Sequence, residues 1–256
     1  MQVNPQSFSF VRWAQVMTPQ SLYKFHPDNK YLIEMLVDKS LFCCDRKKLN
    51  DPHDGLFLIS DELKRRMLNN AAAHVVEGFS NNPLYNTIPK SFIADFADKS
   101  FCQKSFYELL ESKGGTLKVC SLTENRENEL MWAHYAENSK GACLEFDFSY
   151  VPNIQNCLVQ VQYTNEVPIA EELTLSELKR LFSIKRKAWE KEEEWRILVN
   201  DIDKVSFEPK NLRRILFGAR MDLLTREKII ETCKKNNLEH VDFKTMNITL
   251  NGINFI

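Results

Sequence analysis

The order of apolar and polar residues along the chain predicts a series of short β-strands. From Ala142 to Phe148, every second residue is apolar, so Ala142, Leu144, Phe146 and Phe148 share one face of a strand. Alternating patterns or short apolar runs predict further strands at 22–25, 41–44, 116–122, 158–163, 194–199, 214–217 and 240–243.

Segments with helical spacing lie between these strands. They predict helices at 31–37, 127–137, 175–189 and 226–235, the last capped by Thr225. Two more helices are predicted between residues 60 and 112. Ser60, followed by two acidic residues, is typical of a helix start, and Gly114-Gly115 ends the second of these helices.

Together these elements predict an α+β fold with a mixed central sheet. The length of 256 residues suits a single domain over 1–256. We expect the helices at about 60–112 to form an insert after the first strands. Strand 214–217, helix 226–235 and strand 240–243 predict a small βαβ unit near the C-terminus, and Asn251-Gly252 predicts a hairpin after it.

Composition narrows the class of protein. A hydrophobic fraction of 43% supports a buried core, and a net charge of -1 gives no overall attraction to nucleic acid or an anionic membrane. No apolar run reaches membrane-spanning length and the N-terminus lacks the charged-then-apolar order of a signal peptide, so we expect a cytoplasmic protein with no membrane partner.

The seven cysteines are scattered without zinc-ligand spacing, so we expect reduced thiols and no metal. The chain has no GxGxxG or Walker loop, which argues against a Rossmann dehydrogenase and a P-loop NTPase.

Three groups of residues are candidates for a functional site. Trp132, His134 and Tyr135 fall within one helical turn and combine aromatic surface with a titratable imidazole. Glu194 and Arg196 share one face of a predicted strand. Each group also has a purely structural interpretation. The aromatic residues of the first group can belong to the core, and Glu194 and Arg196 can form a weak ion pair on the surface.

The third group is Asn50 and Asp51, directly before Pro52. Asx residues at such a position commonly cap a loop, and this needs no ligand. The functional alternative is that the loop borders a binding cavity. If one site exists, Asp51, His134, Tyr135 and Glu194 should line a common cavity.

Four sequence blocks carry a resemblance to a known family. They are Leu22–Phe25, Leu49–Asp54, Cys120–Leu122 with Met131–Tyr135 and Lys140-Gly141, and Glu194–Arg196. Their order and spacing resemble the bacterial domain of unknown function 2971 family from about residue 20 to about 245. Leu49 replaces the usual Phe, and His53-Asp54 also departs from the pattern. Members of this family often look like effector proteins of antiphage and mobile-element loci.

A looser resemblance is to the ADP-ribosyltransferase superfamily. Its members place an aromatic or His on an early strand, an aromatic on a middle element and a Glu on a late strand. The corresponding residues are Tyr23, then Trp132, His134 and Tyr135, then Glu194. This resemblance implies a nucleotide substrate, NAD, consumed by an ADP-ribosyltransferase or NAD glycohydrolase.

The chemistry gives each candidate a role. Breaking the nicotinamide–ribose bond passes through an oxocarbenium-like state, which Glu194 would stabilise, with His134 as general base. Tyr135 or Trp132 would contact nicotinamide. The remaining binding residues are Tyr23, Asn50, Asp51 and Arg196, of which Arg196 would hold a phosphate.

Two other classes of function remain open. Glu145 and Asp147 share a strand face and suit Mg²⁺, which favours a metal-dependent nuclease effector. No Glu-x-Lys on a predicted strand accompanies them, and nuclease cores of the restriction-enzyme type need one. The third class is a non-catalytic module that binds a ligand or partner.

Overall fold

The computed structural model describes residues 19–67, 117–172 and 174–256. Its strands are β1 (Leu22–His26), β2 (Ser40–Phe42), β3 (Cys44–Asp45), β4 (Leu58–Ile59), β5 (Leu117–Thr123), β6 (Ala142–Phe146), β7 (Leu158–Gln160), β8 (Gln162–Thr164), β9 (Ile169–Ala170), β10 (Ile184–Arg186), β11 (Glu194–Asn200), β12 (Lys204–Ser206), β13 (Leu212–Phe217), β14 (Asp242–Thr249) and β15 (Gly252–Phe255). Its labelled α-helices are α1 (Lys30–Asp38), α5 (Glu129–Tyr135), α6 (Pro152–Gln155), α7 (Leu175–Leu181) and α8 (Leu223–Lys235), and a further helix covers the described residues 61–67. The 3-10 helices are η1 (Arg46–Lys48), η3 (Lys187–Glu192) and η4 (Pro209–Asn211).

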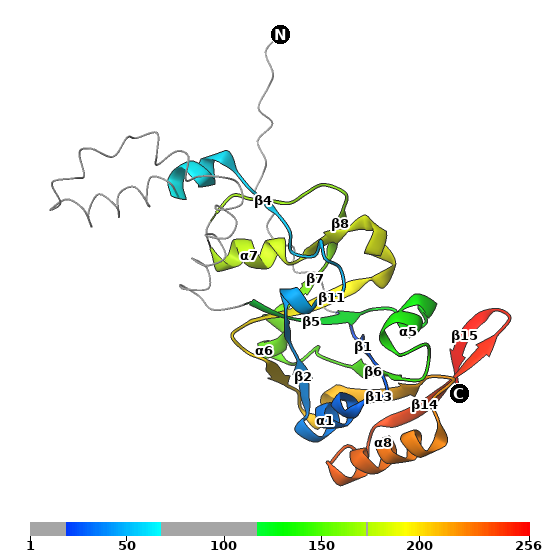
Figure 1. Cartoon of the computed structure of the whole chain (residues 1–256). Helices are drawn as coiled ribbons and strands as arrows, with labels where there is room; N and C mark the ends of the chain where they lie inside the picture. Colours follow the sequence, from blue (N-terminus) through cyan, green and yellow to red (C-terminus); the bar gives the residue numbers. More distant parts are fainter. Residues whose placement is uncertain (1–18, 68–116, 173) are drawn as a thin grey trace, which may run out of the picture.

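A nine-stranded sheet organises the described residues (Figure 1). Its strand order is β15-β14-β13-β6-β1-β5-β11-β7, and the ninth strand, β3, pairs with β5 outside this order. β13 and β14 run parallel, whereas the other pairs along this path are antiparallel. The predicted α+β fold with a mixed central sheet is therefore confirmed.

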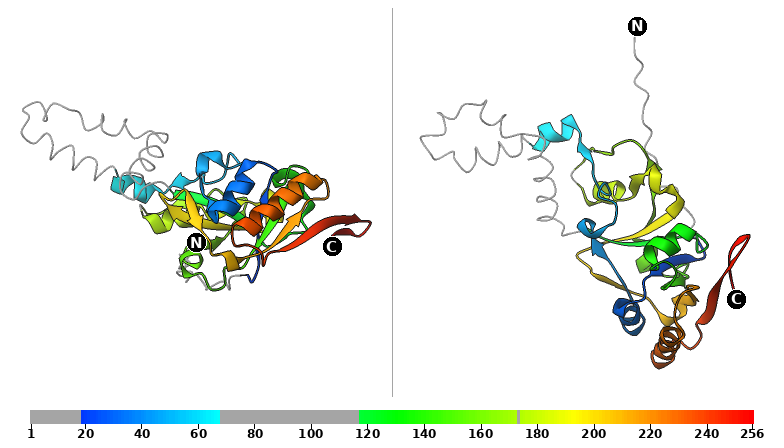
Figure 2. Two further views of the ribbon diagram at one scale, coloured as in Figure 1. Left: turned by 90° about the horizontal axis from the view of Figure 1, so that it is seen from below. Right: turned by 45° about the vertical axis from the view of Figure 1, so that its right-hand side comes forward.

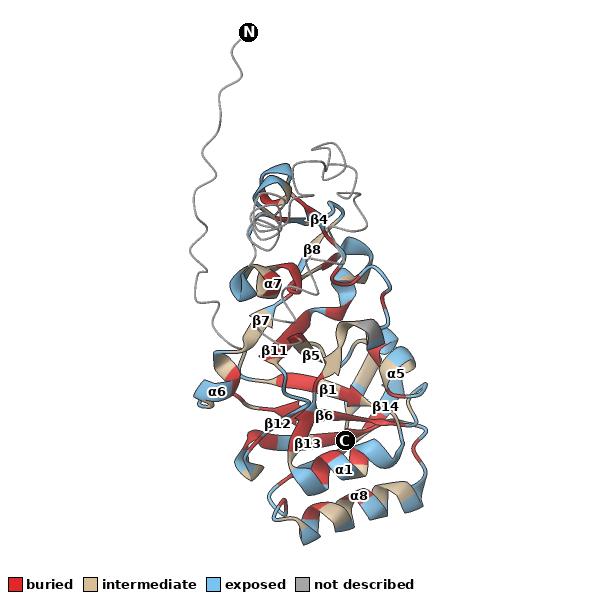
Figure 3. Ribbon diagram, turned by 60° about the vertical axis from the view of Figure 1, so that its left-hand side comes forward, coloured by how far each residue is buried: buried red, intermediate tan, exposed pale blue. Residues whose placement is uncertain are grey.

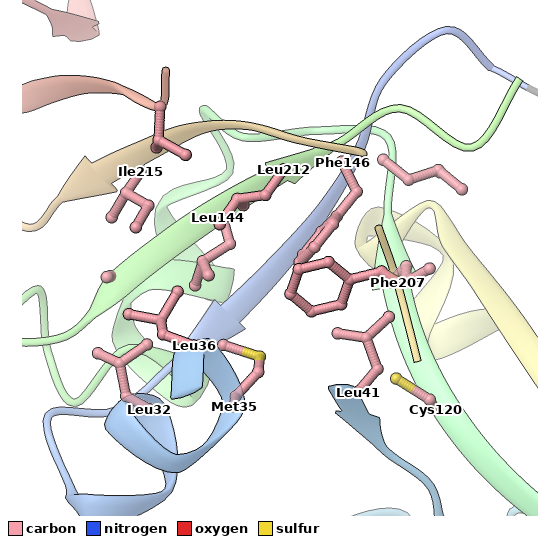
Figure 4. Packing of buried hydrophobic residues seen from close by; sticks show 14 of the residues in the cluster. Leu32, Met35, Leu36, Leu41, Cys120, Leu144, Phe146, Phe207, Leu212 and Ile215 are labelled. Atoms are coloured by element: carbon pink, nitrogen blue, oxygen red, sulfur yellow. The ribbon is translucent and has the colours of Figure 1, made fainter. Parts of the chain in front are cut away.

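Helices α1 and α8 cover one face of the sheet. Their apolar residues Leu36 and Ile229 belong to the same buried cluster as Leu144 and Ile215 of the central strands. Figure 4 shows Leu36, Leu144 and Ile215 within this cluster. In Figure 3 the central strands are largely buried, while the outer surfaces of both helices are exposed. Burial of this face supplies the hydrophobic driving force for docking the helices on the sheet.

Two helices pack on the opposite face. Trp132 of α5 is 1% exposed and meets Phe25 of β1 edge to face, with 5.0 Å between ring centroids. Farther along the sheet, Leu178 of α7 packs with Leu198 of β11. The sheet is thus covered on both faces. This is why consecutive residues of β6 and β11, whose side chains point to opposite faces, are both buried.

The predicted C-terminal unit is confirmed. β13, α8 and β14 form a βαβ unit with parallel strands, and the Asn251-Gly252 turn joins β14 to β15 in a hairpin that extends away from the rest of the sheet (Figure 2). The predicted cap is wrong by three residues. Asp222 is the N-cap of α8 and accepts a hydrogen bond from the Thr225 backbone N–H at 2.9 Å.

Three predicted elements are shorter than expected because long-range pairing interrupts them. The helix predicted at 175–189 ends with α7, and the following residues form β10, which pairs in parallel with β8, and then η3. The strands predicted at 158–163 and 41–44 each divide into two. Ser60 does begin a helix over 61–67, accepting a hydrogen bond from Leu63 N at 3.1 Å, but the predicted insert beyond residue 67 lies outside the described residues.

The sheet opens between β1 and β5. These two strands are paired at a single position, Tyr23 with Thr123. Beyond it β1 continues only alongside β6, while β5 continues alongside β11 and β3. We call this opening the β1–β5 split. It leaves strand edges facing one another across the middle of the sheet, and that is where a cavity forms.

The turn after α5 fixes the end of β1 at this split. A Cβ atom at Gly141 would lie 2.1 Å from the carbonyl oxygen of His26 and 2.9 Å from Pro27 Cα. Backbone atoms cannot move aside as a flexible side chain can. Only a glycine therefore lets the α5–β6 turn pack against the last residue of β1.

Gly141→Ala should lower the free energy of unfolding by about 1–3 kcal/mol, because the added methyl displaces backbone. Urea denaturation followed by tryptophan fluorescence would measure the change. Lys140→Ala is the matched control, since Lys140 is the exposed neighbour in the same turn. Equal stability of the two variants would contradict this account of the turn.

Candidate functional site

A cavity of about 690 Å³ occupies the β1–β5 split. This volume lies within the usual range for small-molecule sites. β1, α1, β2, β5, α5 and β11 all contribute to its walls. Its aromatic lining consists of Tyr23, Phe25, Tyr31, Phe42 and Tyr135.

Arg196 anchors one side of this region and is 0% exposed. Its Nε donates to Glu194 Oε1 at 2.9 Å, and its Nη2 donates to Glu194 Oε2 at 3.0 Å and to Asp54 Oδ2 at 2.5 Å. Its Nη1 donates to Asp54 Oδ1 at 2.8 Å and to the Phe182 carbonyl at 2.7 Å. All five guanidinium N–H groups therefore have partners within the protein.

This geometry corrects two expectations. Glu194 and Arg196 form a buried ion pair, so the surface interpretation is wrong. Arg196 was also predicted to bind a phosphate, but its five N–H donors are all used within the protein and it does not line the cavity. Its role is to hold Asp54, Glu194 and the end of α7 together.

Glu194 reaches the cavity wall with three hydrogen bonds already on its carboxylate. Besides the two bonds from Arg196, Lys185 Nζ donates to Oε2 at 2.9 Å. A carboxylate offers about four lone-pair sites. Burial alone would raise the pKa of Glu194, but the Arg196 and Lys185 charges outweigh it and lower the pKa to about 2. Glu194 is therefore a fixed anion at neutral pH.

Lys185 connects Glu194 to a second carboxylate, Glu192. Its Nζ donates to Glu192 Oε2 at 2.5 Å. Burial would lower the pKa of Lys185, but the neighbouring Glu194 and Glu192 charges outweigh it and raise the pKa. The ammonium is therefore held charged between two acids.

The hydrogen-bond chain continues from Glu192 to the loop after η1. Tyr135 donates its hydroxyl to Glu192 Oε1 at 2.6 Å and accepts a hydrogen bond from Asn50 Nδ2 at 2.5 Å. Burial and the bond to Glu192 both raise the Tyr135 pKa, so the phenol stays protonated and keeps donating. Three parts of the chain that are distant in sequence, the loop after η1, helix α5 and residues 185–194, are thus held together at one wall of the cavity.

Acceptor capacity distinguishes the two glutamates. Each oxygen of Glu192 receives one bond from the groups above, and its side chain is 11% exposed where it lines the cavity. The Glu194 side chain is 4% exposed and already accepts three hydrogen bonds. Of the two glutamates, Glu192 therefore has more room to accept a hydrogen bond from a ligand.

The structure brings half of the predicted site residues to the cavity. Those that line it are Tyr23, Asn50, Tyr135 and Glu194, and those that do not are Asp51, Trp132, His134 and Arg196. The expectation of a common cavity for Asp51, His134, Tyr135 and Glu194 is therefore met by the last two only. The predicted catalytic role of Glu194 remains a prediction.

Helix phase explains the positions on α5. Met131 and Tyr135 are four residues apart and face the cavity, whereas Leu130 and His134 face solvent. Trp132 points into the core, where its Nε1 donates to the Arg126 carbonyl at 2.7 Å. Tyr135 is thus the aromatic residue that α5 gives to the cavity.

Asp51 is a buried loop residue. Its Oδ1 accepts a hydrogen bond from the His53 backbone N–H at 2.9 Å, which is the local capping that Asx residues favour before a turn. It supports the loop that carries Asn50 to Tyr135 and Asp54 to Arg196. Asp51 therefore influences the cavity only indirectly, by fixing the loop that positions Asn50 and Asp54.

Several site residues were not among the sequence candidates. Asp54 was noted only as a departure from a family pattern, Glu192 lies in an acidic run, and Lys185 lies within a segment predicted to be helical. His26, at the end of β1, is the histidine that lines the cavity. Burial lowers its pKa, so the ring is neutral at neutral pH. Only the alternation of Ile184–Arg186 could have placed Lys185 on a strand.

The carboxylates proposed for metal binding have other partners. Glu145 accepts from Ser21 Oγ at 2.7 Å and pairs with Arg214 at 3.2 Å, and Asp147 pairs with Arg213 at 2.8 Å. Within the residues that the structure describes, no cluster of three or more His, Cys, Asp or Glu side chains is arranged to hold a metal ion. These contacts give the nuclease alternative no support.

Residues 131–197 match the family described as Protein of unknown function (DUF2971). No curated protein and no solved structure gives a match to the chain. The matched segment contains Tyr135, Lys185, Glu192, Glu194 and Arg196, which are most of the charged network. No helix in the described ranges is long and apolar enough to cross a membrane.

Removing one partner of Arg196 should be costly. Asp54→Asn turns an amide NH₂ group toward the buried guanidinium, and we expect a loss of roughly 3–5 kcal/mol in the free energy of unfolding. Chemical denaturation would measure it. Glu193→Gln is the control, because Glu193 is exposed and lies between the two buried glutamates. A loss below 1 kcal/mol for Asp54→Asn would contradict the role given to Arg196.

The stabilising effect of Glu194 should depend on pH. Its pKa of about 2 in the folded protein lies below the ordinary value of 4.5, so its contribution is complete above about pH 4.5 and is lost as the pH falls toward 2. The stability difference between wild type and Glu194→Gln should therefore shrink over that range. Urea titrations at a series of pH values would test this, and a difference that stays constant down to pH 2.5 would refute it.

Proposed function

We propose that the protein breaks the nicotinamide–ribose bond of NAD in the cavity at the β1–β5 split, as an ADP-ribosyltransferase or NAD glycohydrolase. The observation that carries this proposal is a carboxylate with open acceptor sites, Glu192, held in place by Lys185 and Tyr135 on the cavity wall. An oxocarbenium-like transition state needs such a fixed anion.

The reaction is balanced without a further redox partner. The bond between the nicotinamide nitrogen and the ribose breaks, and its electron pair leaves with nicotinamide, which becomes neutral. Positive charge then develops on the ribose, and water or an acceptor nucleophile forms the new bond and loses a proton. Glu192 is placed to accept a hydrogen bond from a ribose hydroxyl and to stabilise this charge.

Glu194 takes a supporting role in this proposal. Its charge and the shared Lys185 fix the position of Glu192, because the ammonium donates to both carboxylates. The buried pair with Arg196 keeps Glu194 from moving. Preorganisation of this kind spares the enzyme the reorganisation that water would need at the moment of reaction.

The aromatic lining supplies the surface for a flat ring. Tyr23 on β1 and Tyr135 on α5 both line the cavity, and Glu194 on β11 completes the order of residue types that suggested the superfamily. Neighbouring strands β1, β5 and β11 bring these positions together.

One observation favours a second candidate, a non-catalytic binding module. Every charged group of the network is paired within the protein, and such networks commonly fix structure rather than perform chemistry. In that case NAD or a related nucleotide would stabilise the fold without being consumed.

Nicotinamide release from NAD, followed by chromatography, tests the proposal. Glu192→Gln should reduce turnover by about a hundredfold or more, the loss expected when a preorganised electrostatic group is removed. Glu193→Gln should retain wild-type turnover. If wild type releases no nicotinamide but NAD raises its melting temperature, the binding module is favoured. Full turnover by Glu192→Gln would remove Glu192 from the site.

A further inference from the structure

We propose that Lys24 binds the phosphate group of the ligand in this cavity. The inference extends the proposed function, because it assigns the recognition of the nucleotide's anionic part to a residue outside the glutamate network. Lys24 lies on β1 and lines the cavity.

Among the described residues, two lysines that line the cavity, Lys24 and Lys48, have no carboxylate partner, and of these Lys24 is half-buried whereas Lys48 is exposed. Lys185 is neutralised by Glu192 and Glu194, and Lys204 pairs with Asp38 at 2.5 Å. Asp54 is matched by Arg196. Among the residues described by the structure, no carboxylate lies within 4.0 Å of the Lys24 ammonium, so its charge lacks an acidic partner.

Lys24 also keeps donors for a ligand. Its Nζ donates across the β1–β5 split to the carbonyl oxygen of Ser121 at 2.9 Å. An ammonium has three donors, and a neutral carbonyl takes one of them without cancelling the charge. A half-buried cation of this kind gains more from an anion than an exposed lysine does, because solvent screens it less.

Strand geometry places Lys24 on the opposite side of the sheet from Tyr23 and Tyr135. Side chains alternate along β1, so Leu22 and Lys24 face the side of the sheet covered by α1, while Tyr23 faces α5. The cavity crosses the split and receives side chains from both sides. A nucleotide can therefore place its nicotinamide ribose at Glu192 and its phosphate at Lys24.

The simplest structural alternative is that Lys24 acts only as a brace, holding β1 and β5 together across the split through its bond to Ser121. Loss of such a brace would change the shape of the cavity and so weaken the binding of all ligands alike. A phosphate-binding lysine affects only ligands that carry phosphate, and its effect weakens as salt increases. These outcomes differ in a binding experiment.

Isothermal titration calorimetry on the full chain tests the inference with two probes. ADP-ribose carries the diphosphate and cannot release nicotinamide, and nicotinamide riboside carries no phosphate. Lys24→Gln should weaken ADP-ribose binding by roughly tenfold or more, since it removes a charge-assisted hydrogen bond. It should leave nicotinamide riboside binding within about twofold of wild type, and the salt dependence for ADP-ribose should flatten.

Lys228→Gln on α8 is the matched control, an exposed lysine outside the cavity. Lys24→Gln overturns the inference if it behaves like this control, or if it weakens both probes equally, as a brace would. Absence of ADP-ribose binding to wild type also overturns it. ADP-ribose binding that depends on Lys24, without any nicotinamide release from NAD, would support the inference while refuting the proposed catalysis.

Discussion

The arrangement of the site depends on the burial of Arg196. A guanidinium that is 0% exposed must satisfy its charge and five donors inside the protein, or the fold pays a large desolvation cost. Asp54, Glu194 and the Phe182 carbonyl meet this demand together. They come from a loop, a strand and the end of a helix, so one side chain fixes the relative positions of three segments.

The rest of the network follows from that anchor. Arg196 holds Glu194 by hydrogen bonds, and Glu194 in turn orients the Lys185 ammonium. Lys185 orients Glu192, which accepts a hydrogen bond from the Tyr135 hydroxyl. Each contact uses acceptor sites, and of the two glutamates in this network Glu192 keeps more of them open beside the cavity. Buried ionic networks contribute less to stability than to the definition of one geometry. A fixed carboxylate is what cleavage of a glycosidic bond needs.

Much of the fold could be predicted from periodicity, because strand alternation and the Asn251-Gly252 turn are local signals. The helix predicted at 175–189 failed because pairing of β10 with β8 is not local. At the site, spacing correctly placed Glu194 and Arg196 on one face, but their burial depends on Asp54, 142 residues from Arg196 in sequence. Tyr135 and His134 could not be ranked, since the sequence does not show which side of α5 meets the sheet.

The cavity itself results from strand pairing that stops. β1 and β5 meet at Tyr23 and Thr123 and then separate, so polar backbone groups face an opening instead of a neighbouring strand. Such groups need other partners, and Lys24 provides one by donating to Ser121. A cation, aromatic side chains and the glutamate network all lie at this opening. A ligand with an anionic part, a flat ring and hydroxyl groups would match all three features, and this match is the basis on which we propose a nucleotide.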